Sequence, residues 1–415
     1  MTIHQSIRKI LSSFTDVVDA NSYADGFFSD YAISNDIANE IVSNLPKLKQ
    51  PLLKTLEIAN TSGNLTQKIL NKYKDSCIFI NATILVSSKE KFDICSAIFD
   101  KYIPKSPSHK INIIIGDFLE VDISNYHIIL GTPEIKKVTG NEKAALSLIY
   151  DDKKANNKSI FALHKATQIG NLVCFIMPKA FLHNSEYSVC RRKISQIKID
   201  QITDLGEKAY KSASFEFIAL YLKPNEKPSQ TLIKSTIDRT SRIKDQNNIT
   251  DERFPTWLIY RNPSFNEFAD KMRFDCFDVY RDRRITSSKL EPNGEVRVIN
   301  SKNFPEPNVF ITTEYDKYVK PESLGSCQTL NFLDSDDVFI CPNMTLKTRV
   351  IKKPRGVVAN GSLAILTPKV TLSDIDIDFY SSEEFHSFYY IVRNKSKRLL
   401  NLDKNAIYYF GILAD

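Results

Sequence analysis

Two short turns place polar or acidic side chains at the ends of apolar, strand-like runs, where enzymes built on parallel sheets hold their reacting groups. The run YHIILG ends in Thr132, Pro133, Glu134 and Ile135. The run KINIIIG ends in Asp117, whose carboxylate could accept hydrogen bonds from a bound amino group or could cap the following helix. The first turn therefore offers a hydroxyl, a carboxylate and an aliphatic chain, but neither an amide nor an aromatic ring.

Two further segments place glycine or phenylalanine just before a helical pattern. The strand-like run KTLEIAN leads into Thr61, Gly63 and Asn64, and then into the helical pattern NLTQKILNKY. A glycine here would let the backbone approach a ligand closely and adopt a positive φ. Upstream, Phe28 lies in ADGFFSDY, where two phenylalanines fit the buried cap of a helix equally well.

Neither metal binding nor disulfide bonding is expected. The seven cysteines are scattered without a Cys-x-x-Cys pair, and the six histidines show no ligand spacing. The acids at 334–337 and 374–378 are interpreted as a solvated strand edge rather than as a cation site. We therefore expect buried, reduced thiols, no bound metal and a cytoplasmic location.

Arginine is concentrated in the second half of the chain. Of 16 arginines, only Arg8, Arg191 and Arg192 precede residue 225, whereas lysine is spread through both halves. The guanidinium fork suits guanine edges and phosphates, and the net charge of +7 permits a polyanionic partner. Salt-bridged surface arginine would explain the same composition, so both interpretations stay open.

The order of strand-like and helical patterns divides the chain into four segments. Residues 1–50 are expected to form a helical cap segment, 51–225 an α/β domain, 226–255 a linker and 256–415 a second domain. Between 51 and 225, near-continuous apolar runs alternate with helical patterns, which predicts a Rossmann-like, doubly wound sheet with helices on both faces. After Trp257, short strand-like pieces separated by Gly, Pro and Asn predict a mostly β domain with the terminal helix SEEFHSFYYIVRNK.

No membrane partner is expected. The sequence has no run of about 18 apolar residues that could span a bilayer. The first residues lack the long apolar core and the cleavage site of a secretory signal. With Ile7, Ile10, Leu11 and Phe14 on one face, they predict a short amphipathic helix.

Taken in order, these segments resemble the gamma-class adenine DNA methyltransferases of restriction–modification systems, and the resemblance extends over most of the chain. Phe28 in GFFS matches the family's opening Gly-x-Phe-Phe-Thr segment, which covers S-adenosylmethionine. Gly63 and Asn64 match the family's glycine-rich turn, and Asp117 in GDFL matches the acidic turn that meets the adenine amino group of the cofactor. The resemblance implies a methyltransferase sheet followed by a target-recognition domain.

Three of the family's functional motifs are altered in this sequence. Thr61 stands where the first glycine of the cofactor turn belongs, and the second strand offers only neutral Asn81 in place of the ribose-binding carboxylate. The family's Asn-Pro-Pro-Tyr, which grips a flipped adenine, reads Thr-Pro-Glu-Ile at residues 132–135. Lost stacking costs about 1–3 kcal/mol per base, so we assign no catalytic residue. The vestigial cofactor-binding residues are Phe28, Gly63, Asn64 and Asp117.

The second half resembles the target-recognition domains of such methyltransferases and of type I specificity subunits. Those domains carry an arginine-rich hairpin, matched by FDVYRDRRITSSK, and an Asn-Gly-Ser-x-Ala segment, matched at residues 360–364. Alternatively, Asp275, Asp278 and Asp282 neutralise the hairpin as a solvated face. The expected DNA-binding residues are Arg281, Arg283, Arg284, Lys347, Arg349, Lys352, Lys353 and Arg355.

These expectations combine into a DNA-binding, non-catalytic methyltransferase-like subunit that provides target recognition to an active adenine DNA methyltransferase. Its expected partners are double-stranded DNA and that active subunit, in a heterodimer or larger complex. This chain is expected to bind no cofactor, and the partner subunit would bind S-adenosylmethionine. Two alternatives stay open: an active adenine DNA methyltransferase with a divergent motif at 132–135, and an RNA adenine methyltransferase, because LEIANTSGNLT also resembles ribosomal RNA adenine dimethylases.

Overall fold

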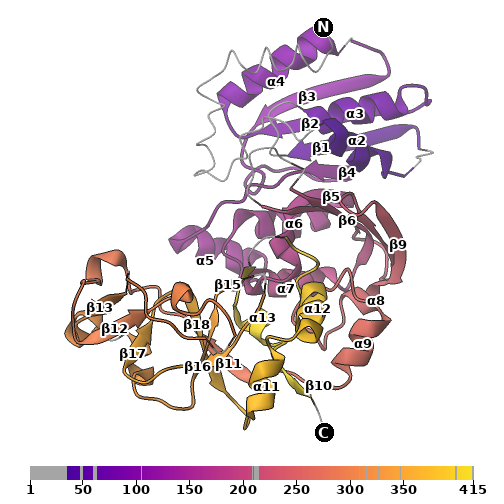
Figure 1. Ribbon diagram of the computed structural model, residues 1–415. Helices are drawn as coiled ribbons and strands as arrows, with labels where there is room; N and C mark the ends of the chain where they lie inside the picture. The colour runs from indigo at the N-terminus through magenta and orange to yellow at the C-terminus, as the bar shows by residue number, and fades with distance from the viewer. Residues whose placement is uncertain are drawn as a thin grey trace. The chain divides into compact units, whose positions relative to one another are not determined.

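The chain divides into two compact units (Figure 1). The computed structural model describes residues 35–46, 50–58, 63–103, 105–207, 209, 215–307, 309–314, 316–325, 327–345, 347–397 and 400–413. Unit 1 comprises Met1–Leu182 and Glu186–Asp251, and unit 2 comprises His183–Ser185 and Glu252–Asp415. The amphipathic helix expected near the N-terminus lies outside the described residues.

Unit 1 is built on a nine-stranded sheet with the order β3-β2-β1-β4-β5-β7-β6-β8-β9. Its first five strands along the chain are mutually parallel, whereas β7 is antiparallel to both β5 and β6. This arrangement is the Rossmann-like methyltransferase sheet, so the predicted fold class is confirmed. The strands are β1 (Leu52–Ile58), β2 (Phe79–Val86), β3 (His109–Ile115), β4 (Tyr126–Gly131), β5 (Gly170–Pro178), β6 (Lys198–Gly206), β7 (Phe217–Lys223), β8 (Gln230–Ser235) and β9 (Thr240–Asp245).

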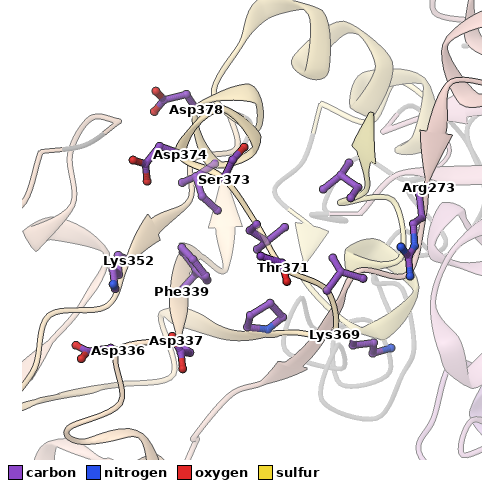
Figure 2. Close-up of a pocket in the computed structure, with 15 residues that line it drawn as sticks. Arg273, Asp336, Asp337, Phe339, Lys352, Lys369, Thr371, Ser373, Asp374 and Asp378 are labelled. Atoms are coloured by element: carbon purple, nitrogen blue, oxygen red, sulfur yellow. The ribbon is translucent and has the colours of Figure 1, made fainter. Parts of the chain in front are cut away.

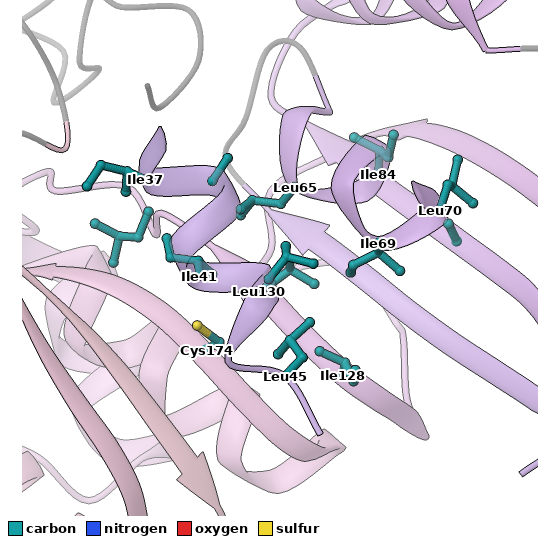
Figure 3. Packing of buried hydrophobic residues seen from close by; sticks show 14 of the residues in the cluster. Ile37, Ile41, Leu45, Leu65, Ile69, Leu70, Ile84, Ile128, Leu130 and Cys174 are labelled. Atoms are coloured by element: carbon teal, nitrogen blue, oxygen red, sulfur yellow. The ribbon is translucent and has the colours of Figure 1, made fainter. Parts of the chain in front are cut away.

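Apolar residues at helical spacing hold α2 (Asn35–Ser43) and α3 (Asn64–Tyr73) against one face of this sheet (Figure 3). Leu65 and Ile69 of α3 pack in one cluster with Ile41 of α2, Ile84 of β2 and Leu130 of β4. All five side chains are almost fully buried, which stabilises each by about 1.5–3 kcal/mol relative to exposure. The helices of unit 1 are α2 (Asn35–Ser43), α3 (Asn64–Tyr73), α4 (Lys89–Tyr102), α5 (Gly140–Ile149), α6 (Lys158–Ile169), α7 (Ser188–Ile194) and α8 (Gln246–Ile249), with the 3-10 turns η3 (Lys179–Leu182) and η4 (Ser185–Tyr187).

The central strands are buried on both faces, as their continuous apolar runs predict. Leu130 and Cys174 face the cluster with α2 and α3. Their neighbours Ile129 and Val173 are also fully buried, and successive strand residues point to opposite faces. The second face is therefore covered too, on the side of α6 (Figure 1).

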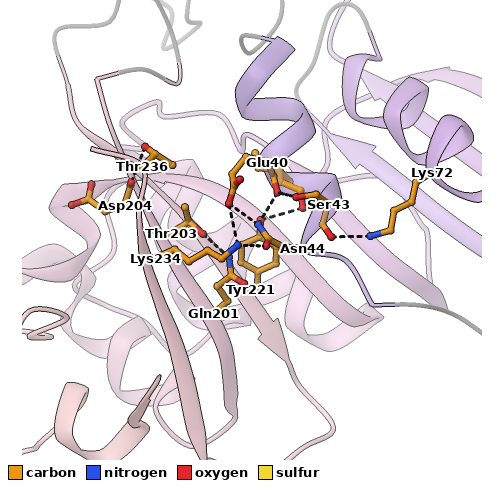
Figure 4. A network of polar contacts seen from close by, with 11 residues as sticks. Glu40, Ser43, Asn44, Lys72, Gln201, Thr203, Asp204, Tyr221, Lys234 and Thr236 are labelled. Atoms are coloured by element: carbon orange, nitrogen blue, oxygen red, sulfur yellow. Dashed lines mark hydrogen bonds and ion pairs between the residues drawn. The ribbon is translucent and has the colours of Figure 1, made fainter. Parts of the chain in front are cut away.

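Polar contacts fix α2 to its neighbours (Figure 4). The Lys72 ammonium donates to the carbonyl oxygens of Val42, Ser43 and Leu45 at 2.8, 3.0 and 2.6 Å, which satisfies groups that a helix end leaves unpaired. The Tyr221 hydroxyl donates to the Ile41 carbonyl at 3.2 Å. Helix α2, which follows the segment matched to the family's opening motif, is thus anchored through its C-terminal end.

Residues 226–255, expected as a linker, instead largely extend the sheet of unit 1. β8 pairs in parallel with β6, and β9 pairs antiparallel with β8. In β8 only alternate residues, Thr231, Ile233 and Ser235, are buried, and β9 is exposed over nearly its whole length. A strand pair with so few buried apolar residues has little of the hydrophobic pattern by which strands are recognised in a sequence.

Unit 2 consists of small sheets with helices, which confirms the predicted mostly β domain. Its described strands form sheets in the orders β11-β18-β14-β16, β13-β12-β17, β10-β20 and β15-β19. These strands are β10 (Met272–Arg273), β11 (Phe277–Tyr280), β12 (Val296–Ile299), β13 (Lys317–Val319), β14 (Phe339–Pro342), β15 (Met344–Thr345), β16 (Ile351–Lys352), β17 (Val357–Ala359), β18 (Leu363–Pro368), β19 (Leu400–Asn401) and β20 (Ile412–Leu413).

Aromatic side chains dominate the core of unit 2. Phe265 stacks on Phe388 with ring centroids 4.9 Å apart, and Phe385 meets Phe410 edge to face at 5.1 Å. Such pairs contribute about 0.5–1.5 kcal/mol beyond the burial of their area. The helices and 3-10 turns of unit 2 are α9 (Pro263–Ala269), η5 (Ser287–Lys289), η6 (Ser301–Asn303), α10 (Pro321–Leu324), η7 (Gln328–Phe332), α11 (Asp374–Phe379), α12 (Glu383–Val392) and α13 (Lys404–Ile407).

Two expectations for unit 2 have different outcomes. α12 matches the terminal helix predicted from SEEFHSFYYIVRNK. The acids at 374–378, predicted to lie on a strand edge, form helix α11 instead. Ser373 and Asp376 cap each other's backbone amides in a capping box, which favours a helix start over an extended strand.

All seven cysteines are free, and six of them are buried while Cys77 is exposed. Burial raises the pKa of the Cys174 and Cys341 thiols to about 12, so these groups stay protonated and unreactive. Over the described part of the chain, no helix is long and apolar enough to cross a membrane.

Candidate functional site

The carboxyl ends of β1, β2, β3 and β4 meet at one edge of the sheet in unit 1, where ligands bind in open α/β sheets. Three predicted cofactor-binding residues follow these strands: Gly63 and Asn64 after β1, and Asp117 after β3. Phe28 and the altered Thr61 lie outside the described residues. The predicted cofactor turn is therefore described only from Gly63 onward.

Gly63 has a packing role. It precedes α3 with φ of +60°, the left-handed region that favours glycine. A side chain at this position would clash with the ring of Phe99 on α4 and would lie 2.8 Å from Ile84 Cδ1. The glycine that matches the family motif is thus required for close packing of α3, α4 and β2, whether or not a ligand binds.

Glu57 of β1 forms hydrogen bonds with the start of α3, which follows this turn. Its carboxylate is fully buried and accepts hydrogen bonds from the backbone amides of Leu65 at 3.2 Å and Thr66 at 2.7 Å. These amides belong to the first turn of α3, whose unpaired donors and dipole favour a negative charge. The sequence analysis did not single out Glu57, although an acid inside the apolar run KTLEIAN was a signal, because a buried carboxylate needs partners.

Asn81 does not lie where the ribose-binding carboxylate was expected. β2 spans Phe79–Val86, so Asn81 lies near its start, and its Oδ1 accepts from Asn112 Nδ2 at 3.0 Å. The strand runs on to Val86 and is followed by Ser87 and Ser88, the second of which caps α4. No carboxylate directly follows β2, because the two residues after the strand are serines.

A lysine lies between the two candidate turns. Lys158 Nζ is 2.6 Å from Asp117 Oδ2, 3.4 Å from Glu134 Oε2 and 3.8 Å from Glu142 Oε1. Its side chain is only 15% exposed, whereas the side chains of Asp117 and Glu134 are about one-third exposed. The carboxylate matched to the cofactor's adenine and the carboxylate in the altered catalytic turn therefore share one ammonium group.

The ion pairs keep Lys158 charged. Burial lowers the pKa of the ammonium, but the hydrogen bond to Asp117 and the charge of Glu134 outweigh burial and raise the pKa to about 12. The other oxygen of Asp117, Oδ1, accepts from the Leu119 amide at 2.8 Å. Both carboxylate oxygens of Asp117 are thus engaged within the protein.

The turn at 132–135 is also committed to the fold. Thr132 is 8% exposed, and Ile135 packs against the core cluster of unit 1 that includes Ile69 and Leu130. Just beyond the turn, the Lys158 amide donates to the Lys136 carbonyl at 2.8 Å. The side chain at the position of the family's aromatic ring is therefore used for packing.

Three features of the described residues at this edge differ from the arrangement that the resemblance implies for S-adenosylmethionine. Lys158 occupies Asp117, the residues directly after β2 provide no carboxylate, and Glu134 adds a negative charge beside the position of the base clamp. An amino group that approached Asp117 would have to share its carboxylate with an ammonium at 2.6 Å. The geometry supports a structural ion-pair centre that joins the turns after β3 and β4 to the start of α6.

In unit 2, the predicted arginine-rich segment does not form a hairpin. β11 pairs antiparallel with β18, in the register Tyr280 to Ile365, and the residues after Tyr280 leave the sheet without a returning strand. The sequence pattern could not reveal this pairing, because the two strands are far apart along the chain. The segment 281–286 is thus a turn at the end of β11.

Asp282 organises this turn. It is 1% exposed and accepts hydrogen bonds from the Tyr280 hydroxyl at 2.8 Å, the Arg284 amide at 2.9 Å and Arg284 Nε at 3.4 Å. Burial would raise the pKa of the Asp282 carboxyl, but the hydrogen bonds from Arg284 and Tyr280 outweigh burial and hold the pKa below its usual value. Of the three acids in the alternative interpretation, Asp282 pairs with Arg284, whereas Asp275 and Asp278 pair with Lys369.

The Asn360–Ser362 segment lies against the turn. The Asn360 side-chain oxygen accepts from the Ser362 amide at 3.0 Å, and Ser362 Oγ accepts from the Ser301 amide at 2.9 Å. A side chain on Gly361 would lie 3.1 Å from the Asp282 carbonyl oxygen and 3.7 Å from Arg283 Cα. The structure therefore brings together the two segments that resemble target-recognition domains.

Two of the other predicted DNA-binding residues, Arg349 and Lys353, are engaged in the fold. The Arg349 Nε donates to the Phe304 carbonyl at 2.8 Å, and burial lowers its pKa. Lys353 is 2% exposed, and its ammonium donates to the carbonyls of Leu333 and Pro354. Arg355 forms an ion pair with Asp336 and Lys347 one with Glu383, while Arg281 is half-buried.

Lys352 lines a groove of about 1160 Å³ (Figure 2). Four aspartates also line this groove, Asp336, Asp337, Asp374 and Asp378, together with Arg273 and Lys369. Four carboxylates against three cations make it a poor path for a phosphate backbone. Part of both acidic segments thus lines a groove rather than a flat edge. Among the predicted DNA-binding residues, Arg283 and Arg284 are exposed neighbours on the turn that Asp282 organises.

Lys353→Met is expected to remove a rise in unfolding free energy with pH. Burial lowers the pKa of Lys353 to about 8, against an ordinary value of 10.5. Between these values the unfolded chain binds more protons, so stability increases with pH, by about 3 kcal/mol over the window. Urea unfolding of both proteins across this window measures the difference, with the exposed Lys352→Met as control. Parallel curves for Lys353→Met and wild type would contradict the prediction.

No protein-family model matches the sequence, and no curated protein does. Solved structures with a similar fold include the type I restriction–modification methyltransferase subunit from Streptococcus thermophilus, with 16% identity over 51% of this chain and 48% of that chain, at a TM-score of 0.39. The M protein of the type I restriction enzyme EcoKI is 12% identical over 50% of this chain and 48% of that chain, at a TM-score of 0.36. The type ISP restriction–modification enzyme LlaBIII, bound to DNA, is 10% identical over 91% of this chain and 39% of that chain, at a TM-score of 0.49. The chain spans about half or less of these proteins, and the likeness concerns the fold.

Lys158 and Glu57 are the site residues that the sequence analysis missed. Lys158 stands at the start of an ordinary helical pattern, and its contact with Asp117 joins residues 41 positions apart. Nothing local distinguishes it from the other surface lysines. In the sequence Glu134 is only one residue of an altered motif, and the structure shows that it forms an ion pair with Lys158.

Proposed function

We propose that this chain is a non-catalytic, methyltransferase-like subunit that binds double-stranded DNA through unit 2 and provides target recognition to an active adenine methyltransferase subunit. The observation that carries the non-catalytic assignment is the ion pair between Lys158 and Asp117 at 2.6 Å, shared with Glu134. The Lys158 ammonium would compete with a bound adenosine for Asp117, and Glu134 places a charge next to Ile135, the position where the family's aromatic ring would stack on a base.

The cost of reopening this centre supports the proposal. A ligand at Asp117 would leave the largely buried Lys158 ammonium with a weaker partner, at a cost of about 1–3 kcal/mol. This corresponds to about five- to 150-fold in affinity before any ligand contact is gained. The charges of Glu134 and Lys158 neutralise each other, so Glu134 in the altered motif is stabilised by an ion pair.

DNA binding by unit 2 rests on a different observation. Arg283 and Arg284 are exposed on a turn that Asp282 and the Asn360–Ser362 segment hold in place. Guanidinium groups on a fixed backbone suit both phosphates and base edges. Because the two exposed arginines lie in unit 2, DNA recognition does not require a working cofactor site in unit 1.

Calorimetry with S-adenosylmethionine on the full chain, paired with a methyl-transfer assay on duplex DNA, tests the non-catalytic assignment. We expect no measurable heat of binding and no transfer. Micromolar binding with transfer would favour the alternative of an active enzyme with a divergent motif. Binding of duplex DNA is compared with that of a structured RNA of similar length, and a preference for RNA would favour the RNA alternative.

Purification of the chain from its native host tests the assembly. We expect an adenine methyltransferase with an intact Asn-Pro-Pro-Tyr motif to accompany it in stoichiometric amounts. Recovery of the chain alone, with S-adenosylmethionine bound, would reject the role of accessory subunit.

Restoring the motif is expected not to restore activity. The variant Thr132→Asn, Glu134→Pro, Ile135→Tyr rebuilds Asn-Pro-Pro-Tyr, but Lys158 then keeps Asp117 as its main partner and loses Glu134. Transfer of labelled methyl groups to duplex DNA should stay at background, both in this variant and after further substitution of Lys158→Ala, because Thr61 still stands in the cofactor turn. Methylation by the first variant would show that the ion pair and the cofactor turn are not barriers.

A further inference from the structure

The two exposed arginines of the turn after β11 differ in how they are held. Arg284 contacts the buried Asp282 carboxylate through Nε at 3.4 Å and through a terminal nitrogen at 3.5 Å, and its backbone amide donates to the same carboxylate at 2.9 Å. Arg283 is exposed, and no hydrogen bond or ion pair of its side chain is found within the described part of the chain.

Arg284 is pre-organised. Two long contacts with one carboxylate orient the guanidinium, and Asp282 is itself held by Tyr280 and by its burial. The Arg284 side chain is still 49% exposed, so it can meet a ligand without moving. A fixed side chain loses little conformational freedom on binding, which favours contacts that need exact geometry.

Asp282 also cancels most of the charge that Arg284 presents. Attraction to a phosphate depends on unneutralised charge and the release of counterions. Recognition of guanine depends on two parallel hydrogen bonds to O6 and N7 in the major groove. The pair of Arg284 with Asp282 therefore suits a base edge, and the unpaired charge of Arg283 suits a phosphate.

We infer that Arg284, held by Asp282, reads a guanine edge in the major groove, whereas Arg283 contacts the DNA backbone. The inference rests on the proposed function, DNA binding by unit 2. It follows that the recognised DNA sequence contains a G·C pair. Arg284 would provide sequence specificity, and Arg283 would add affinity that does not depend on sequence.

The test selects binding sites from duplex DNA randomised at its centre, with the full chain and its variants. Affinities for the selected and for scrambled duplexes are then measured from about 50 to 200 mM salt. The variants are Arg284→Lys, which keeps the charge and loses the planar fork, Arg283→Gln, which loses the charge, and Asp282→Asn, which loses the partner of Arg284.

Arg284→Lys should reduce the preference for one G·C position about ten- to hundredfold, with the salt dependence unchanged. Arg283→Gln should weaken binding to all sequences alike and lower the slope of affinity against salt by about one. Asp282→Asn should lose the same preference as Arg284→Lys and bind scrambled DNA more tightly, because Arg284 then presents its full charge. Purely structural damage in Asp282→Asn would not raise the affinity for scrambled DNA. Asp282 is buried, so if Asp282→Asn does not fold, the inference is tested by the surface variant Arg284→Lys.

The outcomes separate the inference from the proposed function. Absence of duplex binding by the wild-type chain at low salt would reject DNA binding itself. Binding without sequence preference, equal losses for all sequences in Arg284→Lys, or a changed preference in Arg283→Gln would overturn the division of roles while leaving DNA binding in place.

Discussion

Reversing both charges of the turn after β11, by Arg283→Glu and Arg284→Glu, is expected to weaken duplex binding about a hundredfold or more. Both side chains are exposed, and the turn that carries them is held by buried Asp282 and by the close approach of Gly361. The double variant removes two favourable contacts and places two carboxylates against the phosphates. The slope of affinity against salt should fall by at least one, the contribution of Arg283, measured by fluorescence anisotropy with labelled duplex.

A matched control carries the same change in charge elsewhere in unit 2. Arg355, which pairs with Asp336, and Lys347, which pairs with Glu383, are exposed cations outside the turn after β11, so replacing them changes the net charge equally and leaves the turn intact. Arg355→Glu with Lys347→Glu should therefore weaken binding much less than the first pair. Equal losses in the two double variants would mean that net charge, and not the turn, determines binding.

Local patterns were sufficient to predict most elements of unit 1. The run NLTQKILNKY has its apolar residues at helical spacing, and α3 spans Asn64–Tyr73. The continuous run YHIILG is buried between neighbouring strands and forms β4 over the same residues. Such segments carry enough apolar pattern to define their own structure, and the parallel sheet follows from their alternation.

Features that depend on distant partners were not predictable. β8 and β9 have little apolar pattern and become strands because β6 offers an edge to pair with. β11 was assigned to a hairpin, but its partner is β18. In the candidate site, the identities at 132–135 predicted a lost base clamp, whereas the reason for Glu134 became visible only with Lys158 beside it. Ion pairs across folded turns leave no periodic trace in a sequence.

Gly131→Ala is expected to destabilise unit 1 by about 3–5 kcal/mol, a large part of the stability of a typical domain. Gly131 ends β4 with φ of +134°, a conformation that disfavours any side chain, and it pairs with Ile58 at the end of β1. An added Cβ would overlap the Ile58 carbonyl oxygen and lie 2.9 Å from the Ile58 nitrogen. Both are backbone atoms of a central strand, so they can move only by opening the β1–β4 ladder.

Gly140→Ala provides the control for the backbone strain alone. Gly140 also has a positive φ, of +56°, but an added Cβ would meet nothing within 4 Å. It should therefore cost only the strain of a left-handed alanine, about 1–2 kcal/mol. Urea unfolding of both variants measures the difference. Similar losses would mean that β1 and β4 separate easily at their carboxyl ends, in which case the turn at 132–135 and the Lys158 ion pairs beside it could open to admit a ligand.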